Sequence, residues 1–281
     1  MRLFAEQRRS EDTERGSEAR LSFRRVGAST VIDSAFATSP LRVLMPRNHG
    51  RAAWAYTSTL GGGLVDGDAI RLRVRVGAGA AAALLSQGEN RVYRSPAGCR
   101  SELVVDVEEG GLFALLPDAT VCFAGALYEQ KTELRLAPGA AAVAVDVLAA
   151  GRSARGERWA FRRYGGELSV RSGDRVLVRE RLLLDPDHGP LAERLGRFDA
   201  LCTVLLAGDA LRAERAALAR RIQAAPVPAR AGLVEQANEV GDGALVIRIA
   251  AVSLEDALRA VREHLRFVPD LLGDDPWARR P

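Results

Sequence analysis

The segments VRVGAGAAAALLSQ (74–87), VDVEEGGLFALLPD (105–118) and LRLAPGAAAVAVDV (134–147) align without gaps. Each begins with alternating apolar and polar residues, turns at a shared glycine and continues as an apolar run, which is the pattern of two strands joined by a tight turn. A β-unit repeated about every 30 residues is typical of a β-helix or solenoid, in which each unit buries its apolar strand against the next. A simple meander of hairpins with alanine-rich strands explains the same pattern equally well.

Alternating strands extend beyond these segments. Arginines separate the apolar residues of IRLRVRV (70–76), and SGDR (172–175) joins two alternating runs as a hairpin turn. Helices are predicted only late, at 208–225 and from the N-cap Ser253 to a stop at Pro269. The predicted fold is therefore mainly β, a β-helix or solenoid-like arrangement of many strands with two α-helices in the C-terminal third.

A single β-rich domain is predicted over residues 19–270. Residues 1–18 are charged and lack hydrophobic periodicity, which predicts a disordered tail, and residues 271–281 are predicted to form an exposed tail. No apolar run approaches the roughly 20 residues that cross a bilayer, and the charged N-terminus lacks the apolar centre of a signal peptide. We therefore expect a cytoplasmic protein with no membrane partner.

Charge and cysteine content favour neither a nucleic-acid partner nor a structural zinc site. The net charge is +4, but basic and acidic residues alternate and aromatic residues make up only 5% of the chain, so we expect no phosphate-binding stripe. The three cysteines, Cys99, Cys122 and Cys202, form no CxxC pair and lie among apolar or small residues, as buried side chains do.

The sequence offers little for catalysis, so we do not expect an enzyme. Its three histidines lie in unrelated contexts, and the motifs of serine hydrolases, zinc proteases and P-loop NTPases are missing. Carboxylates near turns remain: Asp66, Asp68, Asp118, Asp146 and Glu157. Such residues usually shape turns, but as a group they can also bind a divalent ion weakly and exchangeably. A metal- or carboxylate-dependent hydrolase using Asp118 and Glu157 is the alternative interpretation.

Five motifs occur in a fixed order: PLRVLMP (40–46), GGGLVDGD (61–68), SQGENRVYRS (86–95), LLPDATVCFAGA (115–126) and AAGRSARGERW (149–159). Together they resemble the urease accessory proteins called UreD or UreH, over roughly residues 21–266. The resemblance implies a β-helix-like fold with two helices and a non-catalytic scaffold that binds apo-urease and the accessory protein UreF, which recruits the GTPase UreG. It also implies nickel in transit through a water-filled tunnel, with no tightly bound cofactor.

Candidate sites follow from the resemblance, residue by residue. The candidates for the nickel path are Asp68, Asp146 and Glu157, followed by Asp66 and Asp118. Asp66 is a departure, because the family often has glycine there, and Asp146 stands where glutamate is frequent.

Partner contact is expected at the C-terminus, because the family docks UreF through its C-terminal region. The partner-binding candidates are Leu254, Leu258, Val261, Leu265 and Trp277. The helical stripe can instead face the protein's own core, and Trp277 can fold back on its own surface. A β-solenoid interaction protein unrelated to urease is a third interpretation of the whole chain.

Overall fold

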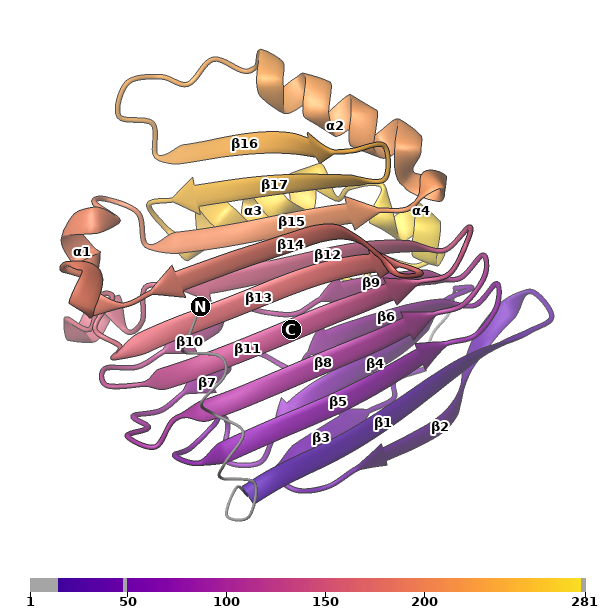
Figure 1. Cartoon of the computed structure of the whole chain (residues 1–281), viewed down its shortest axis with the longest axis horizontal. Coiled ribbons are helices and arrows are strands. Elements are labelled where there is room, and N and C mark those ends of the chain that lie inside the picture. Colours follow the sequence, from indigo (N-terminus) through magenta and orange to yellow (C-terminus); the bar gives the residue numbers. More distant parts are fainter. Residues whose placement is uncertain (1–14, 48–49, 279–281) are drawn as a thin grey trace.

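Two β-sheets packed face to face form most of the protein in a computed structural model, which describes residues 15–47 and 50–278. The seven-stranded sheet has the spatial order β14 (Arg175–Leu184), β13 (Arg163–Ser172), β11 (Leu127–Leu136), β8 (Cys99–Val107), β5 (Asp68–Val76), β1 (Arg15–Val26) and β2 (Ser29–Ala37). The ten-stranded sheet has the order β16 (Leu233–Val240), β17 (Ala244–Ala251), β15 (Ala200–Ala207), β12 (Ala141–Ala149), β9 (Leu112–Leu116), β6 (Ala81–Ser86), β4 (Ala53–Thr59) and β3 (Leu41–Leu44), with β7 (Asn90–Val92) and β10 (Thr120–Cys122) beside it. Figure 1 shows the seven-stranded sheet in front. The fold is mainly β, as predicted.

The three repeated segments of the sequence stack on one another. Each unit contributes one strand to each sheet: β5 and β6, then β8 and β9, then β11 and β12. Within each sheet, successive units pair in parallel. The shared glycines between the strands have positive φ angles, 62° at Gly79, 64° at Gly110 and 71° at Gly139, a conformation that other residues disfavour. A meander is excluded for these units, because strands of a hairpin pair antiparallel.

Outside the repeated units the sheets are mixed. Strand β2 pairs antiparallel with β1, and β14 with β13, at the two edges of the seven-stranded sheet. Strands β15, β16 and β17 extend the ten-stranded sheet in antiparallel pairing. The described residues therefore show neither a closed barrel nor a continuous solenoid, and the β-helix-like description stays a prediction.

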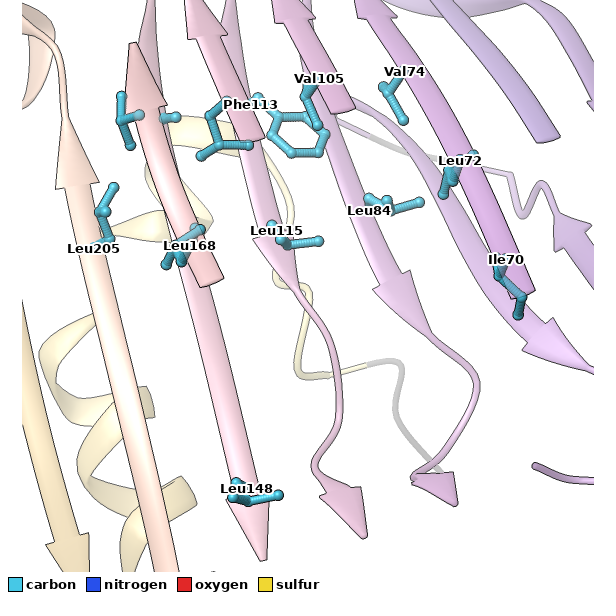
Figure 2. Close-up of a cluster of buried hydrophobic side chains, with 14 of the residues drawn as sticks. Ile70, Leu72, Val74, Leu84, Val105, Phe113, Leu115, Leu148, Leu168 and Leu205 are labelled. Atoms are coloured by element: carbon cyan, nitrogen blue, oxygen red, sulfur yellow. The ribbon is translucent and has the colours of Figure 1, made fainter. Parts of the chain in front are cut away.

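Apolar side chains fill two layers. Between the sheets, inward residues of β5 such as Leu72 and Val74 meet Leu84 and Phe113 from the opposite sheet (Figure 2). The second layer lies between the ten-stranded sheet and the helices α2 (Arg212–Ala224), α3 (Leu254–His264) and α4 (Val268–Leu272). The remaining helix, α1 (Leu191–Arg194), is one turn long. No described helix lies on the outer face of the seven-stranded sheet (Figure 1).

The ends of the predicted domain need correction. Residues 15–18, which were predicted to belong to a disordered tail, are the start of β1, where Ser17 is fully buried and its hydroxyl donates to the Thr38 carbonyl at 2.5 Å. The rest of that predicted tail, residues 1–14, lies outside the described residues. Pro269 does not end the second predicted helix; it lies in the first turn of α4, where a missing N–H costs no helical hydrogen bond.

The C-terminal segment is not an exposed tail either, as far as the structure describes it. Leu272 is buried, and Trp277 packs against the layer between the ten-stranded sheet and the helices. Residues 279–281 lie outside the described range. Within the described ranges no helix is both long enough and apolar enough to cross a membrane.

Ser253→Ala tests the predicted start of α3. The Ser253 hydroxyl accepts a hydrogen bond from the Asp256 N–H at 3.1 Å. Alanine leaves this N–H without its cap, so we expect the free energy of unfolding in urea to fall by about 1 kcal/mol. Ser253→Thr keeps the acceptor and also the hydroxyl that donates to the Asp256 carboxylate at 2.7 Å, and is the control. Equal stability of the alanine variant and the unchanged protein would contradict the capping role.

Candidate functional site

A cavity of about 330 Å³, here called the inter-sheet cavity, lies between the two sheets. Its walls are inward side chains of β5, β8 and β11 on one side and of β6, β9 and β12 on the other. Exposed residues of the segment 87–91 and Gly62 also line it, so the cavity opens to solvent beside these loops. The layer between the sheets is therefore filled at one end and hollow at the other.

Polar side chains line the hollow part. The hydroxyls of Tyr128 and Ser101 are 2.5 Å apart, and the amide of Asn90 donates to the Tyr128 hydroxyl at 3.3 Å. The same amide lies 3.4 Å from the Thr120 hydroxyl. Because a buried polar group is stable only when it is paired, this network holds the cavity wall in one arrangement.

Asp146 on β12 is the carboxylate deepest in this wall. Gln130 donates to its Oδ1 from the facing strand β11 at 2.8 Å. Burial raises the pKa of Asp146, since the charged form is poorly solvated there, and the Gln130 hydrogen bond opposes the rise. Protein surrounds the carboxylate, and its accessible surface faces the cavity. Water or an ion in the cavity can therefore reach it.

A second, small cavity of about 30 Å³ begins on the other side of Asp146. Asp146 and Leu168 line both cavities. The buried Tyr164 hydroxyl also faces the small cavity and interacts with the Asp146 carboxylate. Burial and then the nearby charge of Asp146 raise the pKa of Tyr164 well above its usual value. Asp146 therefore stands between two cavities, beside the Tyr164 hydroxyl.

Asp118 is the other predicted carboxylate in the inter-sheet cavity. Its Oδ2 accepts from the Gly88 N–H at 3.1 Å and from the Ser86 hydroxyl at 3.3 Å. The Ser86 hydroxyl also accepts from the Asp118 N–H at 2.7 Å. Asp118 therefore both shapes the loop at the cavity mouth and presents a carboxylate there.

The other three carboxylates do not line the inter-sheet cavity, and their place on a nickel path stays a prediction. Asp68 accepts from the Val65 N–H at 2.8 Å, and Asp66 from the Ala97 N–H at 2.7 Å, so both shape turns. Glu157 accepts from the Ala124 N–H at 3.1 Å and pairs with Arg152, which lowers the pKa of Glu157. The hydrolase alternative loses its pair of carboxylates, because only Asp118 of that pair lines the cavity.

The predicted partner stripe faces the protein's own core. Val261 and Leu265 are buried against the ten-stranded sheet, while Leu254 and Leu258 are half-buried in the same layer. Trp277 packs beside Leu258 and Val261 rather than standing free in solvent. Val261 and Leu265 are therefore not available to a partner in this structure, and the core-facing interpretation applies to them.

Metal ligation by a compact cluster is not found in the described part of the chain. No group of three or more His, Cys, Asp or Glu side chains there could hold an ion together. Cys99, Cys122 and Cys202 are buried and form no disulfide, and burial raises the pKa of Cys202 to about 12. Any ion in the cavity would meet isolated carboxylates and neutral oxygen atoms.

The sequence interpretation overlooked the polar wall of the cavity, although a signal for it exists. In LYEQKTELRL (127–136) the inward positions are Tyr128, Gln130 and Thr132 before they become leucines. Polar side chains on the inward face of a period-two strand require partners, and their grouping on neighbouring strands points to a hydrated interior.

Known proteins with similar sequences share one description. Residues 15–280 match the family described as "UreD urease accessory protein". A urease accessory protein UreD of Sorangium cellulosum is 46% identical over 92% of this chain and 83% of its own length. A urease accessory protein UreD of an Anaeromyxobacter strain is 39% identical over 95% of this chain and 90% of its own length. A urease accessory protein D of Oryza sativa subsp. indica is 30% identical over 90% and 92%, respectively.

Proposed function

This chain belongs to the UreD family of urease accessory proteins, and from that premise we propose that it passes nickel to apo-urease through the inter-sheet cavity. Its relatives are named as accessory proteins rather than enzymes, and a role in urease maturation follows from the family. In the proposed role the chain is a non-catalytic scaffold in the cytoplasm that binds apo-urease and UreF, with UreG joining through UreF. Nickel is its cargo and not a resident cofactor.

The observation that carries the proposal is the position of Asp146 between the two cavities. A carboxylate that lines both hollows can hand a cation from one to the other without a change in fold. The stacked units support this arrangement: we propose that they form a short β-helix-like core whose interior is hollow where polar residues replace leucines. Asp118 at the mouth would meet the ion first.

The side chains that line the inter-sheet cavity suit an ion that passes through rather than one that stays bound. Nickel held by three or four histidine or cysteine side chains leaves slowly, whereas single carboxylates and neutral oxygen atoms bind a divalent ion weakly. Asp146 must lose its proton to attract a cation, and burial, which raises its pKa, makes a proton a stronger competitor for this carboxylate than for an exposed one. The ion would therefore exchange between sites rather than remain at one.

Deletion of the gene tests the function directly. We expect the urease subunits to be produced in normal amount but to contain little nickel and show little activity, because the proposed delivery route is gone. The readout is the nickel content of the purified urease, measured by elemental analysis. A plasmid copy of the gene should restore this nickel content. Fully loaded urease from the deletion strain would contradict the proposal.

A further inference from the structure

No described helix covers the outer face of the seven-stranded sheet (Figure 1). Strand pairing aligns its outward side chains into rows that cross the sheet, three of which start at Glu18, Phe36 and Ser22. The first row runs Glu18, Arg71, Glu102, Lys131, Glu167, Arg181. Acid and base alternate at every step, and the ion pairs Lys131–Glu102 at 3.5 Å and Arg181–Glu167 at 2.7 Å form within it. The charges of this row therefore neutralise one another within the row.

The second row departs from that pattern. It runs Phe36, Arg20, Arg73, Val104, Glu133, Ser169, Arg179. Arg20 and Arg73 are direct neighbours on adjacent strands, an arrangement of like charges that destabilises a sheet. Arg73 has Val104 on its other side, and its guanidinium makes no hydrogen bond or ion pair with any described residue. Phe36, at the end of the row, is 54% exposed.

The third row repeats the excess of positive charge. It runs Ser22, Arg75, Asp106, Arg135, Arg171, Val176. Arg135 and Arg171 are again like-charged neighbours, and the Arg171 guanidinium donates only to the backbone carbonyl of Asp174, at 3.1 Å. The second and third rows thus carry three arginines and one carboxylate each. Arg20 and Arg75 also pair with carboxylates outside these two rows, Glu18 at 3.5 Å and Glu108 at 2.6 Å.

A hollow of about 290 Å³ lies on this same face where the rows cross β11, β13 and β14. It is lined by Lys131, Glu133, Glu167, Ser169, Arg171, Val176, Arg179 and Arg181. Arg179 and Arg181 share the single carboxylate of Glu167, at 3.6 and 2.7 Å. The positive charge is therefore concentrated in a concave place that can receive a side chain.

We propose that the second and third rows and this hollow form a docking surface for an acidic protein segment. Partner carboxylates bind beside Arg73 and in the hollow, and apolar side chains of the partner cover Phe36, Val104 and Val176. A protein is the fitting occupant because the rows mix arginine with apolar side chains, as protein interfaces do, whereas a phosphate backbone or a lipid headgroup would use only the charges. The surface is separate from the inter-sheet cavity.

The double variant Arg73→Glu/Arg171→Glu separates binding from folding. Each glutamate would sit beside a remaining arginine, Arg20 or Arg135, so the fold exchanges two like-charge contacts for two favourable pairs and loses only the exposed bond from Arg171 to the Asp174 carbonyl. We expect the melting temperature to stay level or rise while binding of labelled poly-L-glutamate to the full chain, followed by fluorescence anisotropy at low salt, weakens about tenfold or more. The binding should also weaken as salt is added.

The control is Arg220→Glu/Arg266→Glu, which makes the same change in net charge at exposed positions of the helical side. It should retain the affinity for poly-L-glutamate. The proposal is overturned if the control loses as much affinity as the double variant, if the double variant keeps full affinity, or if the unchanged protein does not bind the polymer. Tighter binding to duplex DNA or to anionic vesicles than to poly-L-glutamate would also overturn it.

Discussion

Asp146→Asn is expected to make the protein more stable at neutral pH and less able to mature urease. Asparagine has nearly the same shape, and its Oδ1 still accepts the 2.8 Å hydrogen bond from Gln130. Its amide N–H₂ takes the place of the second carboxylate oxygen beside the Tyr164 hydroxyl and can donate to that hydroxyl. The variant therefore removes the buried charge and keeps both neighbours, so the two effects have one cause.

The stability gain follows from the sign of the pKa shift. Burial raises the pKa of Asp146 in the folded protein above the unfolded value of about 3.9. At a pH between the unfolded and the folded pKa, Asp146 is protonated in the folded protein and ionised in the unfolded chain. The free energy of unfolding therefore falls as pH rises through that range, and above the folded pKa the whole cost of burying the charge remains. Each unit of raised pKa costs about 1.4 kcal/mol. Urea denaturation of both proteins at pH 4 and 7 should show that asparagine stabilises mainly at the higher pH.

The functional loss follows from the position of the carboxylate. A cation crossing between the two cavities would meet a neutral amide instead of a charge, and we expect nickel per urease to fall about tenfold in cells that carry the variant. Glu157→Gln is the matched control, because it makes the same chemical change outside the cavity lining. Full nickel content with Asp146→Asn would remove this residue from the path.

Arg158→Ala should cause a large loss of stability without touching either cavity. The Arg158 guanidinium pairs with Asp199 and donates to the carbonyls of Gly196 at 2.5 Å and Phe198 at 2.9 Å. These bonds tie the segment 149–159 to the chain that leads into β15. The neighbouring Trp159 contacts the same segment, because its indole donates to the Phe198 carbonyl at 2.9 Å. The φ angle of Trp159 is 53°, which is unfavourable for a residue other than glycine, so these contacts help to hold its backbone in place.

Removal of the guanidinium leaves Asp199 and the Gly196 carbonyl without this donor, while the Phe198 carbonyl keeps the Trp159 indole. We expect the free energy of unfolding to fall by about 2 kcal/mol, since Arg158 and Asp199 are both half-buried and their hydrogen bonds are charged. Arg155→Ala is the control: this arginine lies in the same motif but is exposed, so its loss should cost less than about 0.5 kcal/mol. Equal effects of the two substitutions, measured by urea denaturation, would contradict the proposed anchoring role.

Local features of the sequence determined much of the fold. Alternation of apolar and polar residues predicted the strands of the repeated units, because successive side chains of a strand face opposite sides. Their glycines marked the turns, and Ser253 marked the start of α3. The order of five short motifs indicated the family, although no single motif identifies a function.

The sequence could not tell which of the predicted site residues face the interior, and the reason is physical. Asp66, Asp118 and Asp146 look alike in the sequence, as carboxylates beside apolar strands. Asp146 faces inward because of its place in the pleat of β12, whereas Asp66 binds a neighbouring loop. The helical stripe of Val261 and Leu265 was compatible with a partner or with the core, and the ten-stranded sheet covers it.

The sequence by itself determined most of the strands, turns and helices, because these depend on neighbours a few residues apart. Only the tertiary structure decided that the repeated units stack in parallel, that Asp146 stands between two cavities, and that Arg20 lies beside Arg73. Those properties depend on the register between strands that are distant in the chain, and a shift of one residue would turn every side chain of a strand to the other face.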